Sequence, residues 1–452
     1  MPLSASDEQF LKTLFRNLED KPLPQGDARY QPVYDDPRGD DPVDLLLKHI
    51  DWSDVSSVQM FSGFRGSGKT TELFRLRAQL EVRGYRVVYA DSLDYLNPAE
   101  PIDISELLIV LAGAFDDGLS QLGVSVAGES YWTRLKNYLI RTEVEVPEIG
   151  LKVEGETPGQ SLAGGLKAGL DLKLALKTTP SFRQRLRTVM SGRIGELKNQ
   201  VDKFLEDAVK AAQSKFGNQR IVFLLDSLEQ IRGSLSNEEE VIRSVERLFT
   251  HHERMLKLPY LHVVYTVPPW LQFAMPNATQ VVMIPSIRQW NNDETRSRYE
   301  RGWQVLHGLL RRRFDEGGCE RFFGPDPEQA AGRLIALCGG HFRDLLLLVR
   351  ETVLRARALP VSEEVTEAAI TAVRGNFLPI AIEDAEWLQE IGRLRSAALP
   401  SARAGDVSRL TRFLDTHFVL YLTNGKEWYD THPLIREEVA QIVQRSRRTS
   451  GQ

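Results

Sequence analysis

The chain has 452 residues, 57 basic and 62 acidic side chains, and a formal net charge of −5. Its length accommodates about two to four domains, and its mixed composition excludes a disordered chain. The acidic balance argues against a protein that binds nucleic acid over its whole surface, although it is compatible with a local basic face.

Cysteine usage and hydropathy bear on the compartment. Cys319 and Cys338 are the only cysteines and lack the spacing of metal ligands, so we expect reduced, non-catalytic thiols and a cytoplasmic protein. The N-terminus lacks the order of a signal peptide, and no run approaches about 18 apolar residues. We therefore expect no membrane association.

Residues 1–50 form a predicted lead-in segment. Apolar spacing predicts a helix over 7–18, prolines then interrupt the chain, and a second helix is expected to begin at Pro42. Tyr30 and Tyr34 allow two interpretations: contacts to a nucleotide base, or ordinary packing on the domain, which is favoured.

Residues 63–70 have the spacing Gly, four residues, Gly, Lys and Thr, which is typical of a loop that holds phosphates. Its glycines let backbone N–H groups turn towards phosphate oxygens, and the following helix adds its positive N-terminal end. Lys69 would reach the β- and γ-phosphates, and the Thr70 hydroxyl would bind Mg²⁺. We favour ATP over GTP because no guanine-specific Asn-Lys-x-Asp motif is present. The expected ATP-binding residues are Gly63, Arg65, Gly66, Ser67, Gly68, Lys69, Thr70 and Thr71.

The next segments predict mixed structure. Residues 85–91 are an apolar, β-branched run typical of a buried parallel strand, and residues 103–122 have the spacing of an amphipathic helix. Residues 166–176 then alternate between leucine or alanine and mostly polar or small side chains, which is the period of a strand. We therefore predict a β-hairpin inserted between about 141 and 180, turning at 157–159.

From Ser181 onward the apolar period changes to three or four residues, which predicts one long helix and an insertion spanning about 141–212. The arginines of this helix allow a surface for nucleic acid or an acidic partner, or an ordinary solvated face, which is favoured. They are Arg183, Arg185, Arg187 and Arg193.

Residues 221–226 are an apolar strand that ends in Asp226, and a parallel sheet would place this carboxylate at the edge beside the phosphate loop. We expect Asp226 to bind Mg²⁺ together with Thr70. A second acid usually follows directly and aligns the attacking water, but Ser227 stands there. Glu229 is the nearest acid that could take that role.

Two further apolar runs, 261–267 and 281–285, bring the predicted strands to five, separated by helices. This pattern predicts an α/β fold with a doubly wound parallel sheet. Thr266 lies near the end of the first run, where it could contact the γ-phosphate or the attacking water, or simply cap the strand.

Residues 299–375 carry only helical patterns, and Arg343 opens a helix after Gly340. A cation there would sense phosphates or lie in solvent. Residues 383–445 predict two helices and then a hairpin turning at 424–425, which is typical of a winged helix. This module contacts DNA in some proteins and other proteins elsewhere. Its predicted helices are made basic by Arg393, Arg395, Arg403, Arg409 and Arg412.

Together these motifs resemble the additional-strand P-loop ATPases of the AAA+ class and their signalling relatives, the STAND ATPases. Residues 63–70 match the Walker A motif, 221–226 resemble the Walker B strand, and Arg343 resembles the sensor-2 arginine of the helical lid. In STAND proteins a histidine of the winged helix can touch the β-phosphate and lock a closed state. The resemblance assigns this role to His432.

Two departures from the family pattern favour a slow switch over a fast motor. The Walker B strand lacks its paired acid, and no arginine stands between Thr266 and the last strand, where ring-forming ATPases carry an arginine finger. Arg288 or a partner would have to supply that group.

We therefore expect a regulatory ATPase that binds ATP and Mg²⁺, hydrolyses ATP slowly and switches conformation or oligomeric state. It would act as a homo-oligomer with a separate protein effector in bacterial signalling or anti-phage defence. The alternative is a DNA-bound initiator or transposition-helper ATPase that uses the winged helix, and a third interpretation is a scaffold that binds ATP without hydrolysis. The expected domains are a lead-in segment (1–50), an ATPase core (51–290), a helical lid (291–378) and a winged helix with a basic tail (379–452).

Overall fold

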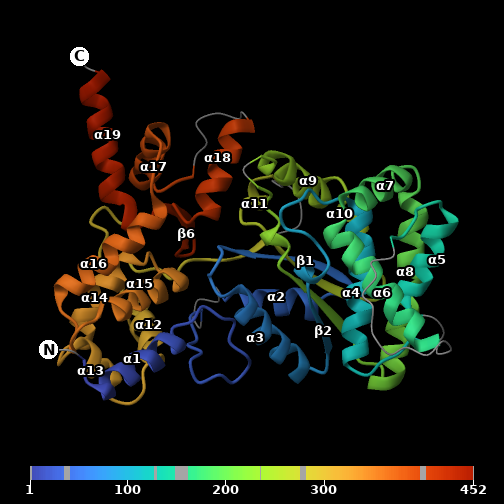
Figure 1. Cartoon of the computed structure of the whole chain (residues 1–452), viewed down its shortest axis with the longest axis horizontal. Helices are drawn as coiled ribbons and strands as arrows, with labels where there is room; N and C mark the ends of the chain where they lie inside the picture. Colours follow the sequence, from blue (N-terminus) through green and yellow to red (C-terminus); the bar gives the residue numbers. More distant parts are fainter. Residues whose placement is uncertain are drawn as a thin grey trace. The chain divides into compact units, whose positions relative to one another are not determined.

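The computed structural model describes residues 3–34, 41–126, 130–147, 161–234, 236–274, 281–397 and 404–450 (Figure 1). The chain divides into two compact units. The terminal unit comprises Met1–Pro42, Gly63–Phe74 and Met283–Gln452, and the sheet unit comprises Val43–Ser62 and Arg75–Val282. The phosphate-loop segment is thus grouped with the C-terminal half of the chain, and the four linear domains expected from the sequence stay a prediction.

The predicted five-stranded sheet is present, with the order β2-β3-β4-β1-β5. β1 pairs in parallel with β4, β4 with β3, and β3 with β2. All residues of β3 and β4 are buried, as expected for strands covered on both faces. β4 therefore separates the strand that leads into the phosphate loop from the strand that ends in Asp226. The strands are β1 (Ser57–Gly63), β2 (Arg86–Asp91), β3 (Ile221–Asp226), β4 (His262–Val267) and β5 (Val281–Ile284).

Helices pack against this sheet, and α4 is the central one. Asp103 and Glu106 form a capping box at its start, and α4 contacts β2, α5, α7 and α8 (Figure 1). Fifteen of its residues are buried, so this helix is the core of the sheet unit. The helices in this part of the chain are α2 (Pro42–Asp51), α3 (Lys69–Val82), α4 (Ile104–Gln121), α5 (Tyr131–Arg141), α6 (Ser161–Thr178), α7 (Pro180–Met190), α8 (Ile194–Phe216), α9 (Glu238–Thr250), α10 (Glu253–Leu256) and α11 (Leu271–Ala274).

The predicted inserted hairpin is wrong. Residues 166–176, whose alternation predicted a strand, lie in α6. Apolar side chains at every second position also satisfy helical spacing: Leu172 and Leu176 are buried four residues apart, whereas Leu170 is 50% exposed. Burial along one helical face therefore decides between the two periods. The turn expected at 157–159 lies outside the described residues.

The predicted long helix is interrupted. α7 ends at Met190 and α8 begins at Ile194, with a turn over 191–193 between them. Gly192 stands in this turn, and glycine costs about 1 kcal/mol relative to alanine inside a helix. The apolar period continues across the break, so the sequence pattern alone did not reveal it.

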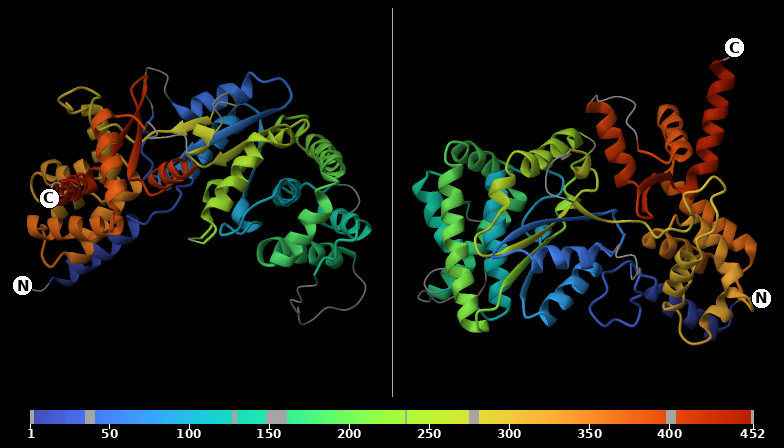
Figure 2. Two further views of the ribbon diagram at one scale, coloured as in Figure 1. Left: turned by 90° about the horizontal axis from the view of Figure 1, so that it is seen from above. Right: turned by 180° about the vertical axis from the view of Figure 1, so that it is seen from behind.

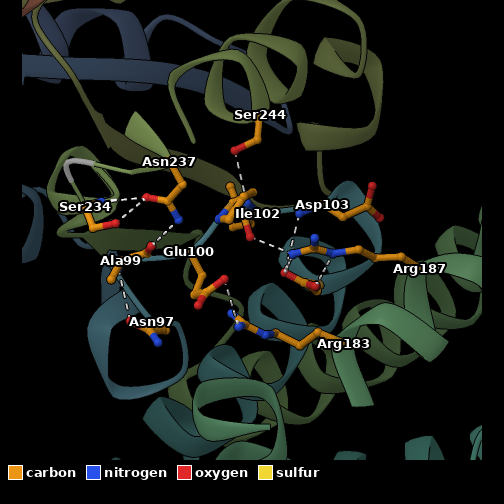
Figure 3. A network of polar contacts seen from close by, with 12 residues as sticks. Asn97, Ala99, Glu100, Ile102, Asp103, Arg183, Arg187, Ser234, Asn237 and Ser244 are labelled. Carbon is orange, nitrogen blue, oxygen red and sulfur yellow. Dashed lines mark hydrogen bonds and ion pairs between the residues drawn. The ribbon is translucent and has the colours of Figure 1, made fainter. Parts of the chain in front are cut away.

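Most arginines of this region make intramolecular contacts (Figure 3). Arg187 donates to Glu106 Oε1 at 2.7 Å and to the Pro101 carbonyl at 2.6 Å, and Arg183 forms an ion pair with Glu100 at 3.5 Å. Arg185 donates to the Glu143 carbonyl at 3.0 Å. The contacts of Arg183 and Arg187 join α7 to α4 and its preceding loop, so they correct the interpretations of a solvated face or a nucleic-acid surface for these two residues.

The loop that precedes α4 also forms hydrogen bonds with α9 and the residue that precedes it. Ile102 N donates to Ser244 Oγ at 3.0 Å, and Asn237 Nδ2 donates to the Ala99 carbonyl at 2.9 Å (Figure 3). The buried α4 is thus flanked by a loop with hydrogen bonds to two helices.

A glycine of α4 sets the approach of α5. A Cβ added to Gly113 would lie 2.1 Å from Trp132 Cζ2, so Gly113→Ala forces Trp132 or α5 to move. We expect a loss of about 1–3 kcal/mol in the free energy of unfolding, measured with urea. Gly195→Ala in α8 is the control, because nothing lies within 4 Å of its added Cβ. We expect that change to gain up to about 1 kcal/mol, and a gain at both positions would contradict the prediction.

Asp116 is a buried carboxyl of α4 that accepts a hydrogen bond from Tyr131 N at 3.2 Å. Burial raises its pKa from 3.8 to about 6. Folding therefore disfavours its charged form, and the wild type loses stability as the pH rises from about 4 to about 6. We expect Asp116→Asn to raise the free energy of unfolding by about 1–3 kcal/mol at pH 7 and by much less near pH 4. Urea unfolding at both pH values tests this, and an equal gain at both would count against it.

The terminal unit contains the predicted C-terminal helices and hairpin. The hairpin turns through Gly425, whose φ of 87° lies in the left-handed region. α17 packs against α19 and β7, and α18 packs against β6 (Figure 2). Two helices followed by a hairpin are thus present as expected, whereas the winged-helix assignment stays a prediction. The elements are α1 (Ala5–Asn17), α12 (Glu300–Arg311), α13 (Gly318–Phe323), α14 (Pro327–Leu337), α15 (Phe342–Arg355), α16 (Glu363–Arg374), α17 (Ile382–Leu394), α18 (Ala404–Asp415), β6 (Val419–Thr423), β7 (Glu427–Thr431) and α19 (Arg436–Ser450).

Cys319 and Cys338 are buried free thiols, and burial raises their pKa values to about 11 and about 12. Such thiols are poor nucleophiles at neutral pH, in agreement with the expected non-catalytic role. Within the described part of the chain, none of the helices has the length and apolar character needed to cross a membrane.

Candidate nucleotide-binding site

The phosphate loop lies between β1 and α3, as predicted. Gly66 and Gly68 have φ values of 85° and 88°, a backbone region that side chains disfavour. A Cβ on Gly66 would lie 2.7 Å from Arg343 Cβ, and a Cβ on Gly63 would lie 2.8 Å from Ser67 Oγ. Glycine is therefore required at these positions by conformation or by close approach.

Lys69 lies inside the loop and is 5% exposed. Its ammonium donates to the carbonyls of Gly63 at 2.9 Å and Phe64 at 3.0 Å. Ser67 Oγ is also buried and has no hydrogen-bond partner among the residues described. Leaving a buried hydroxyl unpaired costs about 1–3 kcal/mol, which favours a ligand that would accept or donate here. A buried cation beside a curled glycine loop matches the chemistry of a polyphosphate.

The neighbouring threonines differ. Thr70 follows Lys69 in the first turn of α3, where the sequence predicts a Mg²⁺ ligand. Thr71 Oγ1 accepts a hydrogen bond from Leu23 N at 3.1 Å. Thr71 therefore connects the loop to the N-terminal segment, a contact that the motif did not reveal.

Arg343 is the predicted sensor cation, and the structure brings its side chain against Gly66. Its Nε donates to Asp20, a residue of the N-terminal segment. The guanidinium is thus positioned beside the phosphate loop and has an acidic partner. The Arg65 carbonyl accepts a hydrogen bond from His341 Nε2 at 2.9 Å, so two residues at the start of α15 contact the loop.

Asp226 lies at the end of β3 in the sheet unit and is 1% exposed. Its Oδ1 accepts from Ser227 N at 2.8 Å, and its Oδ2 accepts from the Tyr89 hydroxyl at 3.0 Å. Burial and the Asp226 charge raise the pKa of Tyr89, so this hydroxyl stays a donor. Asp91 is paired with Asp226 in the ladder between β2 and β3. Tyr89 and Asp91 had no sequence signal, since ladder neighbours depend on strand order.

Two more predicted residues lie near the carboxyl ends of these strands. Glu229 is 5% exposed and lies two residues after Ser227, whose φ of 71° is left-handed and costs about 1–3 kcal/mol for a non-glycine residue. Thr266 is fully buried on β4, is paired with Phe61 of β1, and its hydroxyl lacks a partner within the described ranges. The strained turn and the unpaired hydroxyl are both common at functional sites.

His432 is fully buried and faces α15. Its Nδ1 accepts from Leu434 N at 3.3 Å, and its Nε2 lies 3.3 Å from Asp344 Oδ2. Its ring stacks on Phe377 with ring centroids 5.1 Å apart. The contact with Asp344 was missed because nothing in the sequence joins positions 344 and 432. Contact with a β-phosphate stays a prediction.

Tyr30, Tyr34 and Arg288, the arginine that could replace the missing arginine finger, also make contacts within the chain. The Tyr30 hydroxyl donates to Glu72 Oε1 at 3.2 Å, and that of Tyr34 donates to the Pro285 carbonyl at 3.0 Å. These contacts agree with the favoured packing interpretation. The Arg288 guanidinium lies over the Tyr299 ring at 3.6 Å.

The predicted residues fall into two sets. The loop residues, Arg343 and His432 belong to the terminal unit, and Asp226, Glu229 and Thr266 belong to the sheet unit. Within the sheet unit, the parallel pairing of β1, β4 and β3 puts their carboxyl ends at one edge, from which the chain of β1 continues into the loop. Each set by itself suits part of the chemistry of ATP with Mg²⁺: the loop N–H groups and Lys69 suit phosphates, the Thr70 hydroxyl offers one oxygen ligand, and the Asp226 carboxylate in the other unit offers another.

Comparisons with known proteins give only distant likenesses. No protein-family model and no curated protein matches the chain. Similar solved structures include Cdc6p from Pyrobaculum aerophilum, at 11% identity and a TM-score of 0.37, covering 95% of this chain and 98% of that chain. The ORC2 protein of Aeropyrum pernix in its ADP form has 12% identity and a TM-score of 0.41, with coverage of 95% and 98%. A Walker-type ATPase of Pyrococcus abyssi has 12% identity and a TM-score of 0.39, with coverage of 95% and 99%. These values are too low to carry an argument about reaction or partner.

Proposed function

We propose that this chain is an ATP-binding, slowly hydrolysing ATPase of the AAA+ type that works as a nucleotide-dependent switch. The observation that carries the proposal is the loop between β1 and α3, where Gly66 and Gly68 adopt left-handed conformations around the buried ammonium of Lys69. The strand order, with β4 between β1 and β3, supports the additional-strand class. Neither the loop nor the strand order depends on the distant likenesses.

In this proposal each residue has a distinct role. Lys69 and the loop N–H groups bind the phosphates, and Thr70 and Asp226 hold Mg²⁺, which stabilises charge on the transferred phosphoryl group. Tyr89 orients the Asp226 carboxylate through the 3.0 Å hydrogen bond. Glu229 orients the attacking water, and its separation from Asp226 by two residues makes turnover slow. The reaction converts ATP and water into ADP and phosphate.

The switch itself involves Arg343. Its guanidinium donates to Asp20 and lies against Gly66, so a γ-phosphate at the loop would compete with Asp20 for it. Such a competition gives ATP and ADP different affinities for two arrangements of the terminal unit, which is the requirement for a nucleotide switch. A homo-oligomer or an effector protein would respond to this change, in signalling or anti-phage defence or in another pathway.

The contacts of four C-terminal arginines weaken the case for DNA contact at these positions. Arg409 and Arg412 both donate to Asp384, Arg393 donates to Glu390, and Arg395 donates to Asn292. These side chains already have partners within the chain. Arg403 lies outside the described residues.

A DNA-bound initiator or transposition-helper ATPase is the second candidate. Arg447 and Arg448 are exposed in the last turn of α19, beside a hairpin-containing module. Such a basic helix end could contact the phosphates of duplex DNA. Cdc6p and ORC2 are among the similar structures, but their TM-scores are too low to support this candidate. Its support therefore comes from Arg447 and Arg448 alone.

Nucleotide affinity and protein mass with and without ATP and Mg²⁺ test the proposal. We expect Lys69→Ala to weaken ATP binding about 10- to 100-fold and to abolish any ATP-dependent assembly, because a charge-assisted contact is worth about 1.5–3 kcal/mol. Lys48→Ala, a surface lysine paired with Asp44, is the control and should bind ATP normally. Equal ATP affinity in wild type and Lys69→Ala would refute nucleotide binding at the loop. The second candidate would be favoured if the protein mass is the same with and without ATP. In that case the affinity for duplex DNA should also fall steeply with salt concentration and change when ATP is added.

A further inference from the structure

Two histidines and an aspartate that are not themselves assigned to ATP or Mg²⁺ meet inside the terminal unit, next to Phe64 and Arg65 of the phosphate loop. His341 precedes α15, Asp344 lies in its first turn, and His417 stands between α18 and β6. They are 1%, 5% and 8% exposed, and one nitrogen or oxygen atom from each lies within 4.8 Å of the other two. The sequence offers no spacing that predicts this meeting, because His417 comes from a different part of the chain.

The hydrogen bonds of His341 determine which nitrogen carries a proton. Nε2 lies 2.9 Å from the Arg65 carbonyl, which can only accept, so Nε2 must be protonated. Nδ1 lies 2.8 Å from Asp344 Oδ2. This contact with a carboxylate oxygen requires either a proton on Nδ1 or a metal ion between the two acceptor atoms. A ring that donates one N–H to a backbone carbonyl and presents its other nitrogen to a metal is the usual arrangement of a metal-binding histidine.

The other two histidines complete the arrangement. His417 Nδ1 lies 3.7 Å from Asp344 Oδ2, and its buried Nε2 has no hydrogen-bond partner among the described residues. His432 accepts at Nδ1 from Leu434 N, so its Nε2 carries the proton and faces Asp344 Oδ2 at 3.3 Å. His432 is therefore an outer partner of the carboxylate, and the available ligand atoms are His341 Nδ1, His417 Nδ1 and an Asp344 oxygen.

We propose that His341, His417 and Asp344 bind one Zn²⁺ ion within the terminal unit. Ligands at about 2.0–2.1 Å in a tetrahedron lie about 3.3 Å apart, between the 2.8 and 3.7 Å separations from Asp344 Oδ2 that His341 Nδ1 and His417 Nδ1 show. Two imidazole nitrogens with one carboxylate oxygen suit Zn²⁺ better than Mg²⁺ or Ca²⁺, which prefer oxygen ligands alone. A water molecule would fill the fourth position.

The ion would connect three segments that are far apart in the chain. It joins the start of α15 to the turn before β6, and His341 extends the connection to the Arg65 carbonyl of the phosphate loop. The Phe64 ring contacts the His417 ring at a centroid distance of 5.9 Å, which adds a second contact between the loop and this cluster. Zinc would therefore stabilise the terminal unit and is separate from the Mg²⁺ expected with ATP.

The test uses full-length protein without an affinity tag, stripped with a chelator and free of nucleotide. We expect calorimetric titration to show uptake of one Zn²⁺ per chain, and Co²⁺ to give the strong visible absorption of a tetrahedral nitrogen and oxygen site. Zinc should also raise the melting temperature of the stripped protein. Failure of the wild type to bind either metal, with a melting temperature indifferent to zinc and chelator, overturns the proposal and leaves a proton between His341 and Asp344.

Variants localise the site. We expect His417→Ala and Asp344→Asn to weaken zinc binding at least about 100-fold and to abolish the Co²⁺ spectrum, whereas the exposed His251→Ala should behave as the wild type. Zinc affinity that is unchanged in His417→Ala, or lost equally in His251→Ala, would place the metal elsewhere. His417→Ala retains the contacts of Asp344 with His341 and His432, so we expect this variant to fold. A loss of metal binding in it can therefore be interpreted even if Asp344→Asn folds poorly.

Discussion

Asp226→Asn is expected to abolish the Mg²⁺-dependent part of ATP binding and to slow single-turnover hydrolysis by about 10²- to 10³-fold. The substitution keeps one oxygen that can accept from Ser227 N, and the new amide NH2 can donate to the Tyr89 hydroxyl oxygen, so the end of β3 should keep its shape. It removes the negative charge that the proposed metal ligand supplies, and a lost metal contact of this kind is worth about 3 to 4 kcal/mol of transition-state stabilisation.

The measurement has two parts. ATP affinity with and without Mg²⁺ reports on metal binding, and release of labelled phosphate in a single turnover reports on hydrolysis. Because the first part needs no hydrolysis, it also decides the case in which the wild type only binds ATP. In that case, the loss of Mg²⁺ dependence in Asp226→Asn would still assign the residue.

Asp91→Asn is the matched control. Asp91 ends β2, is the ladder partner of Asp226, and accepts a hydrogen bond from Leu93 N at 2.9 Å. Burial raises the pKa of Asp91, so this carboxyl is less suited to carry charge. We expect its substitution to change Mg²⁺-dependent affinity by less than about threefold. A larger effect at Asp91 than at Asp226 would show that the metal residue had been assigned to the wrong strand.

Arg187→Ala is expected to lower the free energy of unfolding by about 3–5 kcal/mol. Arg187 is the ion-pair partner of Glu106, whose side chain is 1% exposed in the first turn of α4. Removing the guanidinium leaves a buried carboxylate without its cation, and such a loss costs far more than the intact pair contributes. It also leaves the Pro101 carbonyl without the Arg187 donor.

Arg185→Ala, two residues earlier on the same helix, separates this effect from the loss of any arginine. Its ion pair with Glu145 has side chains 49% and 86% exposed, and exposed pairs contribute about 0–1 kcal/mol. We expect urea unfolding to show a loss of that size at most. Similar losses in the two variants would mean that the buried pair has no special role in the stability of α4.

The unpaired Glu106 also gives Arg187→Ala a pH signature. Burial raises the pKa of Glu106, and Arg187 opposes that rise. Without the arginine the pKa of Glu106 should increase further, so folding favours its protonated form. The variant should therefore recover part of its lost stability as the pH falls from 7 towards 5.

The amino-acid sequence by itself determined the features that depend on neighbouring residues. The phosphate loop is a backbone conformation fixed by glycine spacing, and Gly66 and Gly68 take the left-handed φ values that this spacing requires. The strand ending in Asp226 and the turn at Gly425 follow in the same way, because an apolar run or an Asn-Gly pair acts within a few residues.

Only the tertiary structure decided which distant residues meet. The alternating leucines of 166–176 satisfied two periods, and burial of one helical face selected α6. Arg187, which the sequence left on a solvated or ligand-binding face, is instead half-buried as the ion-pair partner of Glu106. The approach of His417 to His341 and Asp344 created a cluster with no sequence spacing. The physical reason is that these outcomes depend on burial and charge pairing between segments tens of residues apart or more, which neither local periodicity nor motif spacing encodes.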